Sequence, residues 1–162
     1  MKSGDATSAM KGATGWLRAA SVLTLLLAAG HTLGMPWTPD RTERGAALVA
    51  ALRAHTFEVM RSTRSYWDFY QGFGITIGVA LLALAILLWQ IGGVARHDAR
   101  LVRPLVATVL VTFAAFAVLD VVYFFAVPLA LTLLCAALVA VAWWRCGGAS
   151  RECDRRAPAA AG

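Results

Sequence analysis

Charged residues are scarce in this chain: they make up 15% of its 162 residues, against about 25% in ordinary soluble domains. Its three cysteines show no CxxC or Cys/His spacing, which argues against a disulfide framework or a zinc site, and no metal is predicted. Walker, HExxH, GxSxG and paired-carboxylate motifs are also missing, so hydrolase chemistry has no support. The net charge of +6 comes from basic residues that flank apolar blocks, and nucleic acid is therefore not a predicted partner.

Apolar residues are in excess, at 59% of the chain. A domain of this size has too much surface to hide them from water, so lipid is the expected solvent. Four apolar blocks are long enough, or nearly so, to cross a bilayer as α-helices. We predict an all-α fold, a four-transmembrane-helix bundle, with spans at residues 16–35, 72–95, 104–127 and 128–144.

Two terminal segments flank the predicted membrane domain of residues 16–144. Residues 1–15 are predicted to be a flexible N-terminus, and residues 145–162 a basic tail. Pro104 suits a first helical turn, and Pro128 marks the point where the chain reverses between the last two spans. The first block also resembles a signal peptide, but its apolar pattern runs past any small-residue cleavage point, which favours a retained span.

Lys and Arg residues are divided unequally between the two sides of such a bundle. Ten lie in the N-terminal segment, the second connection and the tail, and five lie in the first connection. The positive-inside rule therefore predicts a multi-pass protein with both termini in the cytoplasm.

The first connection, residues 36–71, is predicted to contain an amphipathic helix at Arg41–Met60. Asp40 and Glu43 have the spacing of a helix cap and its partner three residues on. Leu48, Leu52, His55 and Val59 then recur at helical spacing on one face. We expect this helix to lie on the outer membrane surface or over the mouth of the bundle.

Asp120 is the only carboxylate inside a predicted span, where an acid is costly and usually has a partner in the bundle interior. At ~1.5 Å per residue it lies about 24 Å along the third span, and His31 lies about 22 Å along the first. Both spans run outward, so we predict that Asp120 and His31 share a depth near the outer face and come into contact.

A second polar cluster lies at the outer end of the second span. We predict that it joins His31 and Asp120 around one shallow pocket for a lipid headgroup, a quinone or a partner helix. Its candidate ligand-binding residues are Arg61, Arg64, Tyr66, Trp67, Asp68, Tyr70 and Tyr123.

Structural interpretations of the same residues stay open. Asp120 can be neutral and join helices by a hydrogen bond, and His31 can be a packing residue or, with His55, a haem ligand. The arginines can anchor at lipid phosphates and the aromatics can form an interfacial belt. Gly74 and Gly78 form a GxxxG step, typical of close helix packing.

The stretch RSTRSYWDFYQGFG at Arg61–Gly74, together with His31-Thr32 and Leu119-Asp120, resembles small bacterial inner-membrane proteins that are broadly DoxX-like. The layout similarity covers most of residues 16–144. The resemblance implies a bacterial inner-membrane location, in a group linked to membrane redox or thiol-stress functions. This chain lacks an outward-facing cysteine pair, which argues against direct thiol–disulfide chemistry.

The sequence thus favours an accessory membrane protein that binds membrane lipids, a quinone or another membrane protein. An alternative is a membrane enzyme or redox component that uses Asp120 and His31 as a proton relay, and whether the chain is an enzyme stays open. A transporter is less favoured, because the chain has few helices and no inverted repeat.

Overall fold

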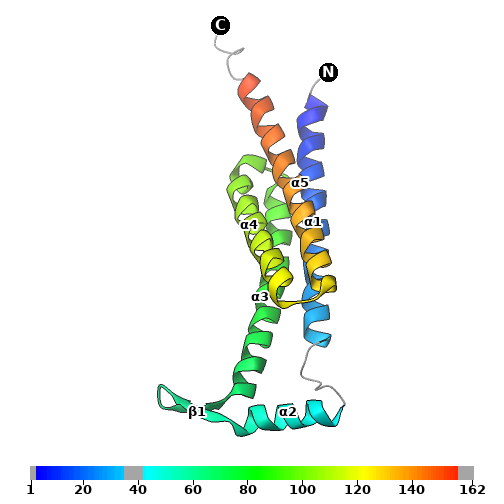
Figure 1. The fold of residues 1–162 in the computed structure, drawn as a ribbon. Coiled ribbons are helices and arrows are strands. Elements are labelled where there is room, and N and C mark those ends of the chain that lie inside the picture. Colours follow the sequence, from blue (N-terminus) through cyan, green and yellow to red (C-terminus); the bar gives the residue numbers. More distant parts are fainter. Residues whose placement is uncertain (1–2, 35–41, 157–162) are drawn as a thin grey trace. The chain divides into compact units, whose positions relative to one another are not determined.

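The structure, a computed structural model, describes residues 3–34 and 42–156, with side chains described for residues 12–34 and 42–148. It contains five α-helices and one β-hairpin in these ranges (Figure 1). In chain order the elements are α1 (Ser3–Leu33), α2 (Glu43–Ala54), β1 (Thr56–Val59), β2 (Ser62–Ser65), α3 (Tyr66–Val94), α4 (Ala99–Tyr123) and α5 (Ala126–Arg156).

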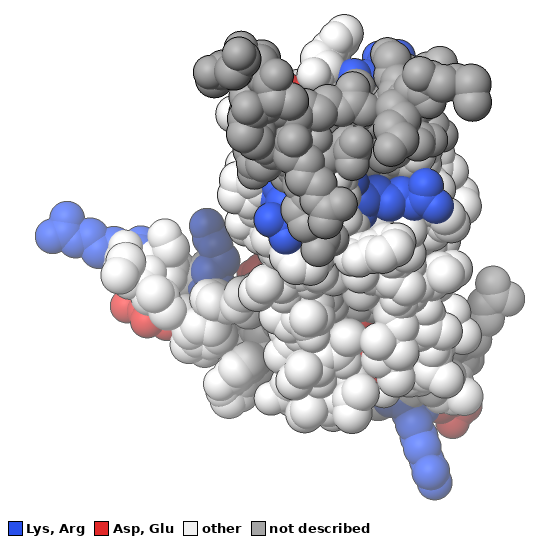
Figure 2. All heavy atoms as spheres, turned by 90° about the horizontal axis from the view of Figure 1, so that it is seen from above, with Lys and Arg blue, Asp and Glu red and all other residues white. Residues whose placement is uncertain are grey.

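Helices α1, α3, α4 and α5 are each long and apolar enough to cross a membrane. This confirms the predicted all-α fold with four apolar helices. In α3, α4 and α5 only 22% of the residues in the most apolar stretch are buried within the protein. Large side chains such as Val111 (68% exposed) point outward, and Figure 2 shows how few charged residues lie among the uncharged ones. An apolar surface of this extent is not stable in water, and the chain is therefore an integral membrane protein.

The described chain divides into two compact units. We call residues 1–27 and 83–162 the bundle unit, and residues 28–82 the hairpin unit. Helices α1 and α3 contribute residues to both units, whereas α4 and α5 belong to the bundle unit alone.

The bundle unit has a core made from one face of each of its four helices. Its largest fully buried apolar side chains are Phe113, Leu17, Leu88, Val102, Val106 and Val139. The core also contains several alanines and two buried cysteines, Cys135 and Cys146, and these small residues let the helices lie close together. Helices α4 and α5 form an antiparallel hairpin that carries much of this core.

Of the two prolines in the α4–α5 pair, Pro104 lies elsewhere than predicted, whereas Pro128 lies within three residues of the chain reversal that it is predicted to mark. Helix α4 begins at Ala99, because the Asp98 carboxylate accepts hydrogen bonds from the backbone N–H groups of Arg100 (2.9 Å) and Leu101 (3.1 Å). Pro104 is therefore inside α4, in its second turn and not its first. The chain reverses at Phe124 and Phe125, and Pro128 lies in the first turn of α5, where its missing N–H costs little.

The hairpin unit corrects the prediction of one helix over Arg41–Met60. Helix α2 begins after Thr42, whose hydroxyl accepts from the N–H of Gly45 (3.1 Å), and it ends at Ala54. The predicted cap Asp40 lies outside the described residues. Beyond Ala54 the chain is extended, so His55 and Val59 do not continue the helical face of Leu48 and Leu52. The β-branched and aromatic residues after His55 favour a strand over a helix.

Strands β1 and β2 pair in antiparallel register, with Val59 opposite Ser62 and Thr56 opposite Ser65. The two turn residues, Met60 and Arg61, both have positive φ values (48° and 67°). This backbone matches the right-handed twist of a two-residue hairpin, although Asn and Gly are the usual residues there. The turn thus exposes Met60 almost completely, at 96%.

Helix α3 starts with a reciprocal capping box. The Asp68 carboxylate accepts from the N–H (2.8 Å) and the hydroxyl (2.9 Å) of Ser65, and the Ser65 hydroxyl accepts from the N–H of Asp68 (3.2 Å). These bonds satisfy backbone donors that the helix leaves free, and so the helix begins at Tyr66, six residues before the predicted apolar block.

We expect Ser65→Ala to weaken the start of α3. Loss of a serine cap costs about 1 kcal/mol, so the first-turn amides of α3 should exchange hydrogen about fivefold faster in detergent micelles. Ser62→Ala, in the same strand, is the matched control and should leave these rates unchanged. Equal rates in both variants would mean that the capping box does not hold this end of α3.

Candidate functional site

Asp120 lies on the buried face of α4, three residues before the end of the helix, and is 9% exposed. Its Oδ2 atom is buried, and no described residue donates a hydrogen bond to it. Two buried hydroxyls of the bundle unit are paired: the Ser21 hydroxyl donates to the carbonyl of Ala85 (2.7 Å), and the Thr24 hydroxyl to that of Ala20 (2.7 Å). Asp120 differs from these two residues in having a buried oxygen without a described partner.

This difference has chemical consequences. A buried acceptor without a donor carries a desolvation cost of about 1–3 kcal/mol, and more if it is charged. Either a proton on the carboxyl group or a donor from a bound molecule removes part of that cost. Asp120 can therefore accept a hydrogen bond from a hydroxyl or amine group, or hold a proton.

His31 belongs to the hairpin unit, near the end of α1. Its Nε2 atom lies 2.9 Å from the carbonyl oxygen of Gly74 on α3. A carbonyl only accepts, so Nε2 carries the hydrogen and Nδ1 is the nitrogen able to accept a proton when the ring is neutral. The predicted contact with Asp120 would join the two units, and it stays a prediction.

Glycine at position 78 lets the end of α1 lie close to α3. A Cβ atom on Gly78 would lie 3.0 Å from the Thr32 hydroxyl oxygen and 3.8 Å from Cδ2 of His31. The end of α1 thus packs directly on the α3 backbone at Gly74 and Gly78, as expected for the GxxxG step.

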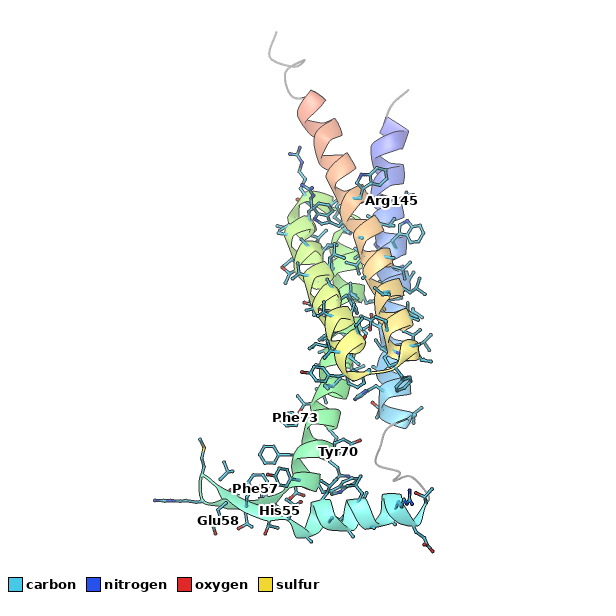
Figure 3. All side chains as sticks on the ribbon, in the orientation of Figure 1. His55, Phe57, Glu58, Tyr70, Phe73 and Arg145 are labelled. Atoms are coloured by element: carbon cyan, nitrogen blue, oxygen red, sulfur yellow. The ribbon has the colours of Figure 1, made fainter. Side chains whose placement is uncertain are left out.

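Aromatic rings pack together where the hairpin meets the first turns of α3. The Tyr66 ring lies 5.2 Å from that of His55 and 5.0 Å from that of Phe57, and Phe69 continues the chain of contacts (Figure 3). Trp67 is 5% exposed, with Tyr70 at 5.6 Å and the Arg53 guanidinium at 5.2 Å from its ring. These contacts fix the hairpin on α3.

The remaining candidate residues are spread over both units. Arg61 is exposed in the hairpin turn, and Arg64 is exposed on β2, where its Nη1 donates to the carbonyl of Thr63 (2.9 Å). The Asp68 carboxylate is occupied by the capping box. Tyr123 ends α4 in the bundle unit and is exposed. The predicted pocket around all of these residues stays a prediction.

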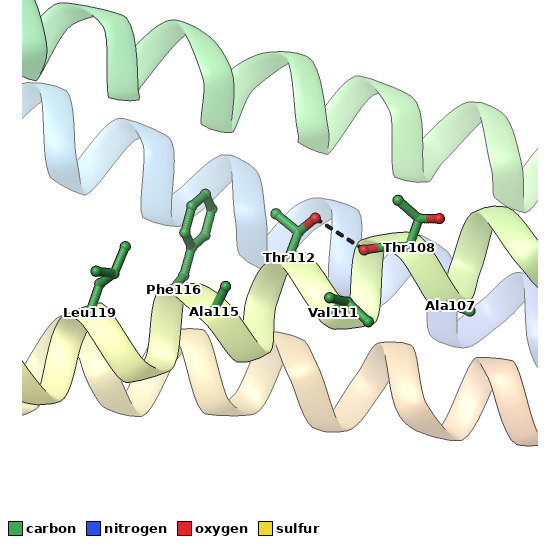
Figure 4. Close-up of a pocket in the computed structure, with 7 residues that line it drawn as sticks. All are labelled: Ala107, Thr108, Val111, Thr112, Ala115, Phe116 and Leu119. Carbon is green, nitrogen blue, oxygen red and sulfur yellow. Dashed lines mark hydrogen bonds between the residues drawn. The ribbon is translucent and has the colours of Figure 1, made fainter.

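A shallow groove runs along the outer side of α4 (Figure 4). The Thr108 and Thr112 hydroxyls in it donate to carbonyls one turn back in the same helix (3.2 and 3.0 Å), and no candidate residue lines it. The groove is an uncharged, lipid-facing surface. Its lining residues are Ala107, Thr108, Val111, Thr112, Ala115, Phe116 and Leu119.

The sequence does not predict three arginine–tryptophan contacts of the bundle unit. In the sequence, Arg18, Arg103 and Arg145 contribute only to the charge count that indicates the orientation. In the structure, each guanidinium packs over a tryptophan ring of a neighbouring helix. The available signal was a tryptophan and a glycine three or four residues apart near the ends of three spans.

No group of three His, Cys, Asp or Glu side chains that could hold a metal ion lies together in the described residues. Comparisons of the chain with protein-family models, curated proteins and solved structures found no match. The resemblance to DoxX-like proteins therefore stays a prediction.

We expect Gly78→Leu to lower the free energy of unfolding by about 1–3 kcal/mol, because the new side chain would push α1 away from α3. The His31 hydrogen bond to Gly74 should break in this variant, and the nitrogen NMR signal of the ring should change. The control is Gly72→Leu on the same helix, where a Cβ atom would meet nothing within 4 Å. Equal behaviour of the two variants would contradict the close helix contact.

Proposed function

We propose that this integral membrane protein is an accessory, non-catalytic binding protein, and that Asp120 contacts its ligand. The ligand is a lipophilic molecule with a hydrogen-bond donor, such as a lipid or a quinone in its reduced, quinol form. A polar side chain of a partner helix would supply the same donor. The observation that carries the proposal is the buried Oδ2 atom of Asp120, to which no described residue donates.

The depth of Asp120 supports this proposal. Asp120 is 21 residues from the start of α4, about 32 Å at ~1.5 Å per residue, and only three residues from its end. A molecule in one leaflet can reach such a depth without crossing the bilayer. Ionisable residues in membrane helices are rare and often mark binding or proton-transfer sites.

The hydroxyl groups of the bundle unit favour binding over covalent catalysis. Ser21 and Thr24 both donate to backbone carbonyls, and the second polar contact of Thr24 is with Cys135 (3.7 Å between Oγ1 and Sγ). A nucleophilic hydroxyl would need a base within hydrogen-bond reach, whereas the hydroxyls of Ser21 and Thr24 donate to backbone carbonyls instead.

A proton relay is the second candidate function, and the hydrogen bond of His31 decides which of its ring nitrogens would take part. With Nε2–H held on the Gly74 carbonyl, Nδ1 is the nitrogen that would take up or release a proton. In this version a bound lipophilic redox molecule exchanges its proton with Asp120 and His31.

The proposal includes an orientation in the bacterial inner membrane. The start of α1, the α3–α4 connection and the end of α5 carry most of the basic residues, which supports a cytoplasmic location for both termini. The β1–β2 hairpin would then face the periplasm.

We expect a Met60→Cys variant to react with a membrane-impermeant maleimide added to intact cells, because residue 60 is almost fully exposed in the hairpin turn. The unsubstituted chain is the control: Cys135 and Cys146 are buried, and Cys153 would lie inside the cell. Labelling of Met60→Cys only after the cells are opened would reverse the proposed orientation.

We expect Asp120→Asn to lose a lipophilic molecule that the unsubstituted protein retains through purification. A hydrogen bond to a charged group contributes about 1.5–3 kcal/mol, so the retained amount should fall about tenfold or more. The measurement is mass spectrometry of organic extracts from equal amounts of each purified protein.

Asp98→Asn is the matched control for this experiment. It makes the same chemical change on the same helix, at an exposed cap where Asn serves as well as Asp. Retention of every molecule by Asp120→Asn, together with a lower melting temperature, would leave Asp120 a purely structural role and overturn the proposal.

A further inference from the structure

Three arginines of the bundle unit lie over tryptophan rings at the level where α3 ends and α4 begins. The guanidinium carbon of Arg18 on α1 is 4.7 Å from the ring centre of Trp89 on α3. That of Arg103 on α4 is 4.7 Å from Trp143 on α5, and that of Arg145 on α5 is 6.0 Å from Trp16 on α1 (Figure 3 labels Arg145). Each pair therefore bridges two different helices, and these distances are those of cation–π contacts.

Each of these arginines also lies against a glycine on the same neighbouring helix. A Cβ atom on Gly147 would lie 3.2 Å from Nε of Arg103, and one on Gly12 would lie 2.6 Å from Nη1 of Arg145. At Gly92 the distance to Cγ of Arg18 would be 3.6 Å. A larger residue at Gly12 or Gly147 would require the arginine side chain to shift.

The same arrangement thus occurs three times. In each case a tryptophan and a glycine, three or four residues apart on one helix, hold the arginine of the next helix. The tryptophan–glycine pairs are Trp89/Gly92, Trp143/Gly147 and Gly12/Trp16. We call the three arginines with their tryptophans the arginine belt.

All three arginines lie at about the same level of the bundle. Trp16, which contacts Arg145, is two residues from Arg18 on α1. Trp143 and Gly147, which contact Arg103, lie on either side of Arg145 in α5. Asp120 is 17 residues from Arg103 along α4, about 25 Å at ~1.5 Å per residue, so the belt is separate from the proposed ligand site.

Three guanidinium charges gathered at one level favour an anion beside them. Their Nε atoms are buried, and no described residue accepts a hydrogen bond from these atoms. The three side chains are only partly buried, so an anion from outside would bind at the terminal Nη groups, in the geometry that a planar guanidinium offers to an oxyanion.

We propose that the arginine belt binds the phosphodiester groups of acidic glycerophospholipids in the adjacent leaflet. Arginine binds phosphate oxygens in pairs, and indole rings prefer the headgroup level of a bilayer. Exposed apolar side chains next to the belt, Leu101, Leu105 and Trp144, would contact the acyl chains of the same lipid. A soluble phosphate would gain nothing from these apolar neighbours, and so the lipid is the favoured source of the phosphate.

The proposal is tested by titrating the full-length protein in a zwitterionic detergent with phosphatidylglycerol, phosphatidylcholine or inorganic phosphate, while tryptophan fluorescence is recorded. We expect saturable binding of phosphatidylglycerol, weaker by about tenfold or more in a variant with Arg18, Arg103 and Arg145 all changed to Gln. Arg96→Gln is the control, because Arg96 is an exposed arginine of the α3–α4 connection. It should bind phosphatidylglycerol like the unsubstituted protein.

Single changes keep the test decisive if the triple variant does not fold. Arg103→Gln alone should weaken phosphatidylglycerol binding about threefold, and Arg103→Lys, which keeps the charge but loses the planar group, should weaken it to a similar extent. Unchanged binding in these variants, or an equal loss in Arg96→Gln, would overturn the proposal in favour of general charge attraction. Competition by millimolar inorganic phosphate would also overturn it, by making the belt a site for the soluble anion.

Discussion

The exposed apolar surface of this protein requires lipid around it, and the placement of the polar groups in the bundle unit depends on that constraint. Four helices can bury only one face each, and Val111, Val118 and Val121 of α4 are all more than 60% exposed. In water this surface would drive aggregation, whereas in a bilayer it needs no further cover. The protein interior is then left to small residues and to the few polar groups that must be paired.

In this setting the polar groups of the bundle unit fall into three kinds. Hydroxyls such as Ser21 and Thr24 donate to backbone carbonyls and join or stiffen helices. The arginines at one end pack on tryptophan and glycine, and their Nε atoms have no described acceptor. Asp120 near the other end has a buried oxygen with no described donor. We propose ligands for the three arginines and for Asp120, because a buried polar atom without a partner costs free energy.

The four spans could be predicted from the sequence because long apolar runs have few alternatives to a membrane helix. The first residues of the helices were harder to predict from the sequence. The Ser65–Asp68 capping box makes α3 begin at Tyr66, and the Asp98 cap makes α4 begin at Ala99, before Pro104. In the first connection helical spacing continued past Ala54, but strand pairing between Thr56–Val59 and Ser62–Ser65 overrides it. Two further features depend on tertiary contacts, which a local sequence pattern does not contain. They are the hydrogen bond from His31 to the Gly74 carbonyl and the packing of the three arginines against glycines of neighbouring helices.

The most direct test of the account is the environment of the outward-facing side of α4. A spin label at Val111→Cys, in protein reconstituted into liposomes, can be probed with oxygen, which concentrates in lipid, and with a water-soluble nickel chelate. The account predicts that oxygen reaches the label far more readily than the chelate does. A label that the chelate reaches as freely as it reaches one at Met60→Cys, in the hairpin turn, would show water at this surface and contradict the membrane-spanning bundle.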